Sequence, residues 1–154
     1  MKISNIARYR DIMKDLRKLP ETSKDINAYC GDEYDVLLSF YEAIYEDELY
    51  EDDIANAFIQ LYSIDFQSKH EGIDTFYENF YEDNKRNDVL RACQWLNQNE
   101  FKLLSGIIQA GYENSEKEGE ASEWIYNNPK VIYSAYRKIM FEFEAKYLKN
   151  VELI

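Results

Sequence analysis

The chain of 154 residues contains few of the residues that break or cross-link a fold. It has five glycines, two prolines and two cysteines, and no apolar run approaches the roughly 18 residues that a membrane span needs. So little turn chemistry disfavours a many-stranded sheet and favours long helices. The N-terminus alternates charged with apolar residues and lacks the apolar core of a secretory signal. We therefore expect neither a membrane-spanning helix nor a signal peptide.

The two cysteines, Cys30 and Cys93, lie far apart in the sequence and form no CxxC ligand pair. We interpret both as reduced core thiols of a cytoplasmic protein, with a disulfide between them as the alternative. Hydrophobic residues make up 45% of the chain and aromatic residues 16%, with fourteen tyrosines. That composition is typical of a folded globular protein, and the length suits a single domain over residues 1–154.

The motifs of common catalytic and cofactor sites are also missing. The scattered glycines form no nucleotide-binding loop and no nucleophile elbow. One histidine, His70, cannot build a zinc site that needs two. The segment 83–88 begins like a calcium loop but has Lys85 at an acidic position. We expect no cofactor, no metal and no catalysis. A small enzyme using paired carboxylates stays an alternative, because sequence does not show the pocket that such a pair requires.

The spacing of apolar residues predicts an all-α, single-domain bundle of about six to eight helices. We expect Gly111 to cap the helix that precedes it, and residues 112–123 to form a loop. Asn128 and Pro129 open a long C-terminal helix, whose wide apolar face places it centrally in the core or partly against a second subunit. The expected helices run over residues 5–19, 32–46, 53–66, 73–82, 88–96, 100–110 and 128–149.

Charge is distributed unevenly along the chain. The formal net charge is -12, and residues 25–68 contain twelve Asp and Glu but no Lys or Arg. The densest stretch, residues 42–53, reads EAIYEDELYEDD and contains seven carboxylates. Because phosphates would repel this protein, we expect no direct binding to nucleic acid or to an anionic membrane.

The acidic segment has two interpretations: a solvated face that serves solubility alone, or a docking surface for a basic partner protein. The like-charged pair Glu42 and Glu46 destabilises a helix by about 0.2–0.5 kcal/mol. A protein that needs only solubility could avoid this loss of stability, so the like-charged pair favours the docking interpretation. Tyr41, Tyr45 and Tyr50 lie among the acids as candidate anchors. The candidate binding residues are Asp35, Glu42, Glu46, Asp47, Glu48, Glu51, Asp52 and Asp53.

The first expected helix is basic, and its role stays open at this point. It contributes to a homodimer, or it pairs with the acidic segment of its own chain and neutralises it. Its cationic residues are Arg8, Arg10, Lys14, Arg17 and Lys18.

The stretch FQSKHEGIDTFYENFYEDNKRNDVLRACQWLN, residues 66–97, resembles a divergent form of an all-helical bacterial family that contains acidic DNA-mimic proteins. The family's hallmark resembles N-G-G-F-x-Q-[YF]-F-x-N followed by a helix with an alanine-leucine pair. The chain departs from it at His70, Glu71 and Thr75. The matching positions are Gly72, Ile73, Phe76, Tyr77, Asn79, Ala92 and Leu96.

The resemblance implies a helical fold and a partner that is a DNA-binding protein, whose basic site this chain would occupy in place of DNA. The leading hypothesis is therefore a non-catalytic acidic interaction module acting as a DNA mimic. Twelve charges correspond to about 20 Å of duplex, and a helix of fourteen residues is about 21 Å long. The alternative is an immunity protein or antitoxin that neutralises a basic nuclease.

Overall fold

The computed structural model describes residues 3–21, 31–69, 76–77, 83–114 and 116–149. Within these ranges the fold is all-α, with seven α-helices, one π-helical segment and no strand, which confirms the predicted class. The elements are α1 (Ile6–Lys18), α2 (Gly31–Glu46), α3 (Asp53–Lys69), α5 (Asp83–Gln98), α6 (Lys102–Glu113), α7 (Glu116–Asn127), α8 (Pro129–Phe143) and the π-helical segment η2 (Glu144–Leu148).

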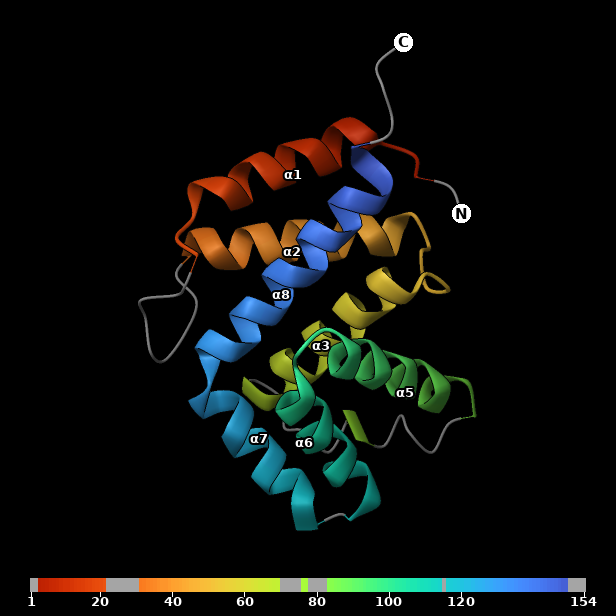
Figure 1. Cartoon of the computed structure of the whole chain (residues 1–154), viewed down its shortest axis with the longest axis vertical. Helices are drawn as coiled ribbons and strands as arrows, with labels where there is room; N and C mark the ends of the chain where they lie inside the picture. Colours follow the sequence, from red (N-terminus) through yellow and green to blue (C-terminus); the bar gives the residue numbers. More distant parts are fainter. Residues whose placement is uncertain (1–2, 22–30, 70–75, 78–82, 115, 150–154) are drawn as a thin grey trace.

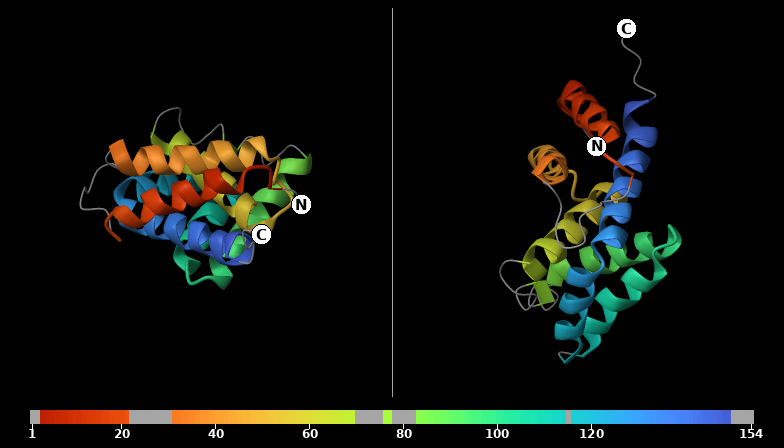
Figure 2. Two further views of the ribbon diagram at one scale, coloured as in Figure 1. Left: turned by 90° about the horizontal axis from the view of Figure 1, so that it is seen from above. Right: turned by 90° about the vertical axis from the view of Figure 1, so that its left-hand side faces the viewer.

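The helices are arranged in two groups joined by α3 and α8 (Figure 1). Helices α1 and α2 lie side by side at one end, and α5, α6 and α7 pack together at the other. Helix α8 runs diagonally between the groups and contacts α1, α3 and α7 (Figure 2). Eight of its residues are buried, so the helix lies in the core, the first of its two predicted positions; packing on a second subunit stays a prediction.

Aromatic rings fill the region where α1, α2, α3 and α8 meet. The ring of Phe40 lies 4.7 Å from Phe58, 5.2 Å from Phe143 and 6.0 Å from Tyr9, measured between centroids. All four side chains are fully buried. Such edge-to-face contacts add to the free energy gained by burying apolar area. This cluster holds α2 and the turn after it in place.

The helix ends follow local capping chemistry. The side chain of Asn5 accepts a hydrogen bond from the backbone N–H of Arg8 (3.1 Å) at the start of α1. Asp52 accepts from the N–H of Ala55 (2.9 Å) at the start of α3. Pro129 occupies the first turn of α8, as predicted.

Two predictions for the region around residues 100–123 are wrong. Gly111 lies inside α6 and does not cap it, and residues 116–127 form α7. The apolar stripe of α7 is too weak to be recognised in so polar a stretch, because only Ala121 and Ile125 of this helix are buried. Helix α7 packs on α6, so tertiary contacts stabilise a segment of weak apolar periodicity.

Of the aromatic helix expected over 73–82, only Phe76 and Tyr77 are described, and both are helical and buried. The remainder of that helix, and Cys30, lie outside the described residues. Cys93 is a buried free thiol, and burial raises its pKa to about 12. No helix in the described ranges has the length and apolar character that crossing a membrane requires.

Candidate protein-binding surface

The turn between α2 and α3 places several of the predicted acids. The N–H of Leu49 donates to the carbonyl of Ile44 (3.2 Å), and that of Glu48 to the carbonyl of Tyr45 (3.1 Å). This pair of bonds is a Schellman motif, which ends α2. Glu48 has a φ of 54° in the position that usually holds glycine. Leu49 is buried beneath the turn, while Glu48 is exposed.

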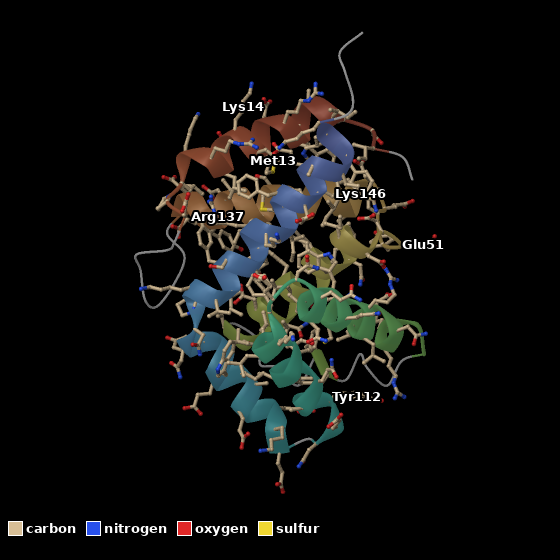
Figure 3. All side chains as sticks on the ribbon, in the orientation of Figure 1. Met13, Lys14, Glu51, Tyr112, Arg137 and Lys146 are labelled. Atoms are coloured by element: carbon tan, nitrogen blue, oxygen red, sulfur yellow. The ribbon has the colours of Figure 1, made fainter. Side chains whose placement is uncertain are left out.

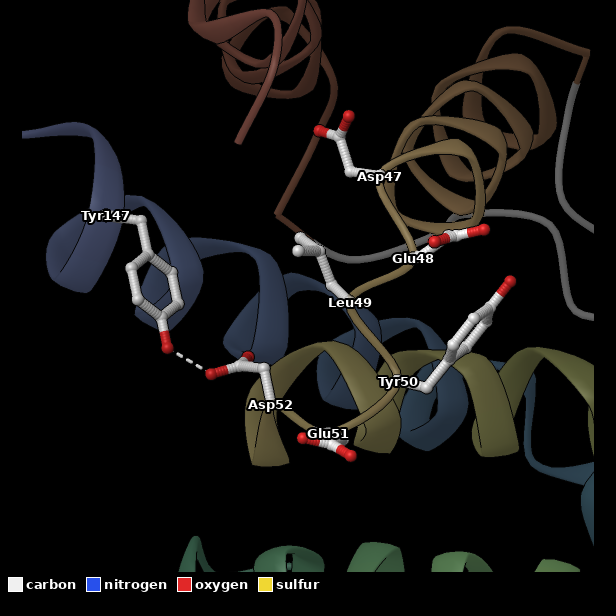
Figure 4. Close-up of a pocket in the computed structure, with 7 residues that line it drawn as sticks. All are labelled: Asp47, Glu48, Leu49, Tyr50, Glu51, Asp52 and Tyr147. Carbon is white, nitrogen blue, oxygen red and sulfur yellow. Dashed lines mark hydrogen bonds between the residues drawn. The ribbon is translucent and has the colours of Figure 1, made fainter. Parts of the chain in front are cut away.

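The turn forms one wall of an acidic cavity of about 630 Å³. We call this region the acidic corner, and Figure 4 shows its lining side chains. Glu48 and Tyr50 extend to the same side of the turn (Figure 4), and Glu51 projects from the edge of the molecule (Figure 3). The lining residues are Asp47, Glu48, Leu49, Tyr50, Glu51, Asp52 and Tyr147.

The far wall of the acidic corner comes from the C-terminal π-helical segment. The hydroxyl of Tyr147 donates a hydrogen bond to Asp52 Oδ1 (Figure 4), while Asp52 Oδ2 caps α3. The Lys146 ammonium lies 4.0 Å from Asp52 Oδ1. The pKa of the Tyr147 hydroxyl is raised above its usual range, chiefly by burial and next by the hydrogen bond to Asp52. Both oxygens of Asp52 therefore have partners within the chain.

Helix α1 neutralises part of the predicted face. Arg8 Nη1 donates to Glu46 Oε2 (2.5 Å), and Arg8 Nη2 lies 4.0 Å from Glu42 Oε2. The hydroxyl of Tyr9 donates to Asp47 Oδ2 (2.6 Å). The pairing of the basic first helix with the acidic segment, left open by the sequence, thus occurs through Arg8.

Helix α5 reaches the same region from the other side. Arg91 Nε donates to Asp53 Oδ1 (3.2 Å), and Nη1 donates to Asp88 Oδ1 (3.1 Å). Its remaining nitrogen, Nη2, donates to the backbone carbonyls of Tyr50 and Glu51 (3.3 Å each). The guanidinium therefore links the turn to α5 and forms an ion pair with Asp53.

Three of the predicted acids are not neutralised by a cationic side chain in the described part of the chain. Asp35, Glu48 and Glu51 are exposed, and none makes an ion pair with the described part of the chain. Two tyrosines accompany the last two acids: Tyr45 is 52% exposed and Tyr50 is 37% exposed. Their rings lie 5.5 Å apart at an interplanar angle of 81°. We call Tyr45, Glu48, Tyr50 and Glu51 the acid–tyrosine patch.

Sequence reasoning missed two of the residues that bind the acids. Arg91 and Tyr147 carried no signal that linked them to the turn, because they lie 38 and 95 residues away from Asp53 and Asp52. Among the described residues, no group of three or more His, Cys, Asp or Glu is placed to hold a metal ion.

Comparison of the chain with known protein families, with curated protein sequences and with solved structures finds no match in any of the three.

Proposed function

We propose that this protein is a non-catalytic interaction module that binds a basic segment of a partner protein through its acidic corner. The observation that carries this proposal is the acid–tyrosine patch. In the described part of the chain Glu48 and Glu51 make no ion pair, at a turn where Asp47, Asp52 and Asp53 all have partners. An exposed carboxylate beside exposed tyrosine rings suits a cationic side chain, which gains both an ion pair and a cation–π contact.

The resemblance to acidic DNA-mimic proteins supports a more specific partner, namely a DNA-binding protein whose basic site would hold this surface. A basic nuclease neutralised by an immunity protein is the alternative, and it would use the same patch. In both cases complementary charge mainly accelerates association and makes binding sensitive to salt.

The test is a pull-down from source-cell lysate with three baits, eluted by a salt gradient and analysed by mass spectrometry. The baits are the wild-type chain, a corner variant (Glu48→Lys with Glu51→Lys) and a control variant (Glu113→Lys with Glu123→Lys). Each double substitution changes the net charge by +4, from -12 to -8. The control residues are exposed acids of α6 and α7.

We expect a basic protein to be retained by the wild-type chain and the control variant, to elute at moderate salt, and to be lost from the corner variant. Circular dichroism should show the same helical content for all three chains. Equal retention by the corner variant would exclude this surface. Equal loss from both variants would show that net charge alone drives binding.

A further inference from the structure

A second hollow lies next to the acid–tyrosine patch, between α2 and α3, and has a volume of about 440 Å³. This value lies within the range of small-ligand sites. Helix α2 contributes Tyr34, Tyr41 and Glu42, which lie on one side of the helix at spacings of seven and eight residues. Helix α3 contributes Tyr62, Phe66 and Gln67. We call this hollow the α2–α3 groove.

The walls of the groove are flat, uncharged rings. Tyr41 and Tyr62 stack at 4.3 Å with an interplanar angle of 19°, and Tyr62 and Phe66 lie 6.3 Å apart at 9°. The pKa of Tyr62 is raised, chiefly by burial and next by a hydrogen bond with Tyr34. Burial is also the main cause that raises the pKa of Tyr41. The phenols therefore stay neutral at physiological pH. The nearly parallel rings suit a planar group that stacks on them.

The groove also contains two hydrogen-bond acceptor side chains, one buried and one at the rim. The side-chain carbonyl oxygen of Gln67, Oε1, is buried and has no hydrogen-bond partner among the described residues. Glu42 lies at the rim with its side chain 54% exposed, and Arg8 reaches it only at 4.0 Å. None of the described residues that line the groove is a lysine or an arginine. Glu42 is the acceptor that a ligand with N–H groups can reach, and a hydrogen bond to a charged group contributes more than one between neutral groups.

We propose that the α2–α3 groove receives an arginine side chain of the basic partner segment. A guanidinium is planar, stacks on aromatic rings and presents five N–H donors. It would donate to Glu42 and stack on the tyrosines, with its aliphatic stem against Leu38, which also lines the groove. A lysine ammonium carries the same charge but cannot stack as a plane. This inference rests on the proposed function and names the residue type that the partner supplies.

The test is an NMR titration of the full chain with N-acetyl-arginine methylamide, with the lysine analogue and with the citrulline analogue, which is the uncharged isostere of arginine. We expect the arginine compound to shift signals of Tyr41, Tyr62 and Gln67. The lysine compound should bind more weakly, and citrulline should not bind. Shifts confined to the acidic corner, or equal binding of citrulline, would overturn the inference.

One substitution in the groove and a matched control elsewhere test the role of Glu42. Glu42→Gln should weaken arginine binding by about tenfold, the usual value of a charge-assisted hydrogen bond. Glu123→Gln, at an exposed acid of α7 outside both proposed surfaces, should leave arginine binding unchanged. Equal affinities for the wild-type chain and Glu42→Gln would overturn the inference.

The two proposals fail differently in the pull-down. If Glu42→Gln retains the partner at wild-type salt concentrations while the corner variant loses it, the groove inference fails and the proposed function stands. If the corner variant also retains the partner, the proposed function fails.

Discussion

Gly111 lies where a side chain would collide with a buried ring. A Cβ built on Gly111 would lie 2.1 Å from the hydroxyl oxygen of Tyr77 and 2.2 Å from its Cζ. The same hydroxyl donates a hydrogen bond to the carbonyl of Ile108 (2.9 Å). The glycine of α6 therefore serves packing, whereas Glu48 and Glu100 occupy left-handed turn positions (φ 54° and 75°) that glycine usually fills. Gly106, Gly111 and Gly119 thus lie inside helices, while glutamates occupy these two left-handed turn positions.

Gly111→Ala should lower the free energy of unfolding by about 1–3 kcal/mol, because Tyr77 must move in a filled core. Gly106→Ala is the matched control on the same helix, since nothing beyond the nearby backbone of α6 itself lies within 4 Å of its added Cβ. That substitution should raise the free energy of unfolding by about 0.5–1 kcal/mol. Urea unfolding of both variants checks the pair. A Gly111→Ala variant as stable as Gly106→Ala would show that Tyr77 does not pack on this glycine.

Helix α1 is joined to two neighbouring elements by arginines in different environments. Arg8 pairs with Glu46 of α2, and the Glu46 side chain is 66% exposed. Arg17 pairs with Glu144 of η2, and the Glu144 side chain is only 10% exposed. The hydrogen bond to Glu144 raises the pKa of the Arg17 guanidinium above its usual range. Loss of Arg17 would leave a nearly buried carboxylate without its counter-ion, whereas loss of Arg8 would leave a carboxylate in water.

Arg17→Met should therefore lower the free energy of unfolding by about 2–3 kcal/mol, and Arg8→Met by less than about 1 kcal/mol. Urea unfolding measures both values. Adding Glu144→Gln to Arg17→Met should recover part of the loss, because the uncompensated charge is removed. If the two single variants were equally stable, burial of Glu144 would have no energetic consequence.

At the scale of the whole molecule, the tyrosines link distant elements through buried hydroxyls. Tyr9 of α1 bonds Asp47 after α2, and Tyr133 of α8 bonds the carbonyl of Pro20 (3.1 Å). Burial is the main cause that raises the pKa values of Tyr9, Tyr77 and Tyr133. Burial of Cys93 acts in the same direction. The folded state therefore keeps these protons at a pH where the unfolded chain releases them.

Stability should be nearly constant around neutral pH and fall as pH rises above about 9–10, where free cysteine and tyrosine ionise. The folded state then binds more protons than the unfolded state, so each such group removes about 1.4 kcal/mol per pH unit until its folded pKa is reached. Urea unfolding between about pH 8 and pH 11 measures the slope. Tyr77→Phe should decline less steeply than the wild-type chain. A stability that stays level or increases over this range would contradict the expectation.

Local sequence determined the class of fold and most helix positions. Apolar spacing located α1, α2, α3 and α8, because these helices bury wide apolar stripes. It failed for α7, whose two buried residues make too weak a stripe, and for Gly111, whose role depends on a ring from elsewhere in the chain. A helix that packing stabilises leaves little local signal.

The sequence by itself also determined that residues 25–68 carry the net charge, because composition needs no coordinates. Only the tertiary structure decided which of those acids contact other side chains and which stay exposed to solvent. Arg8 of α1 and Arg91 of α5 pair with Glu46 and Asp53, and Tyr147 of η2 donates a hydrogen bond to Asp52, while Glu48 and Glu51 stay exposed. Charge along a chain is additive, whereas its compensation depends on which distant side chains the core brings within a few ångströms.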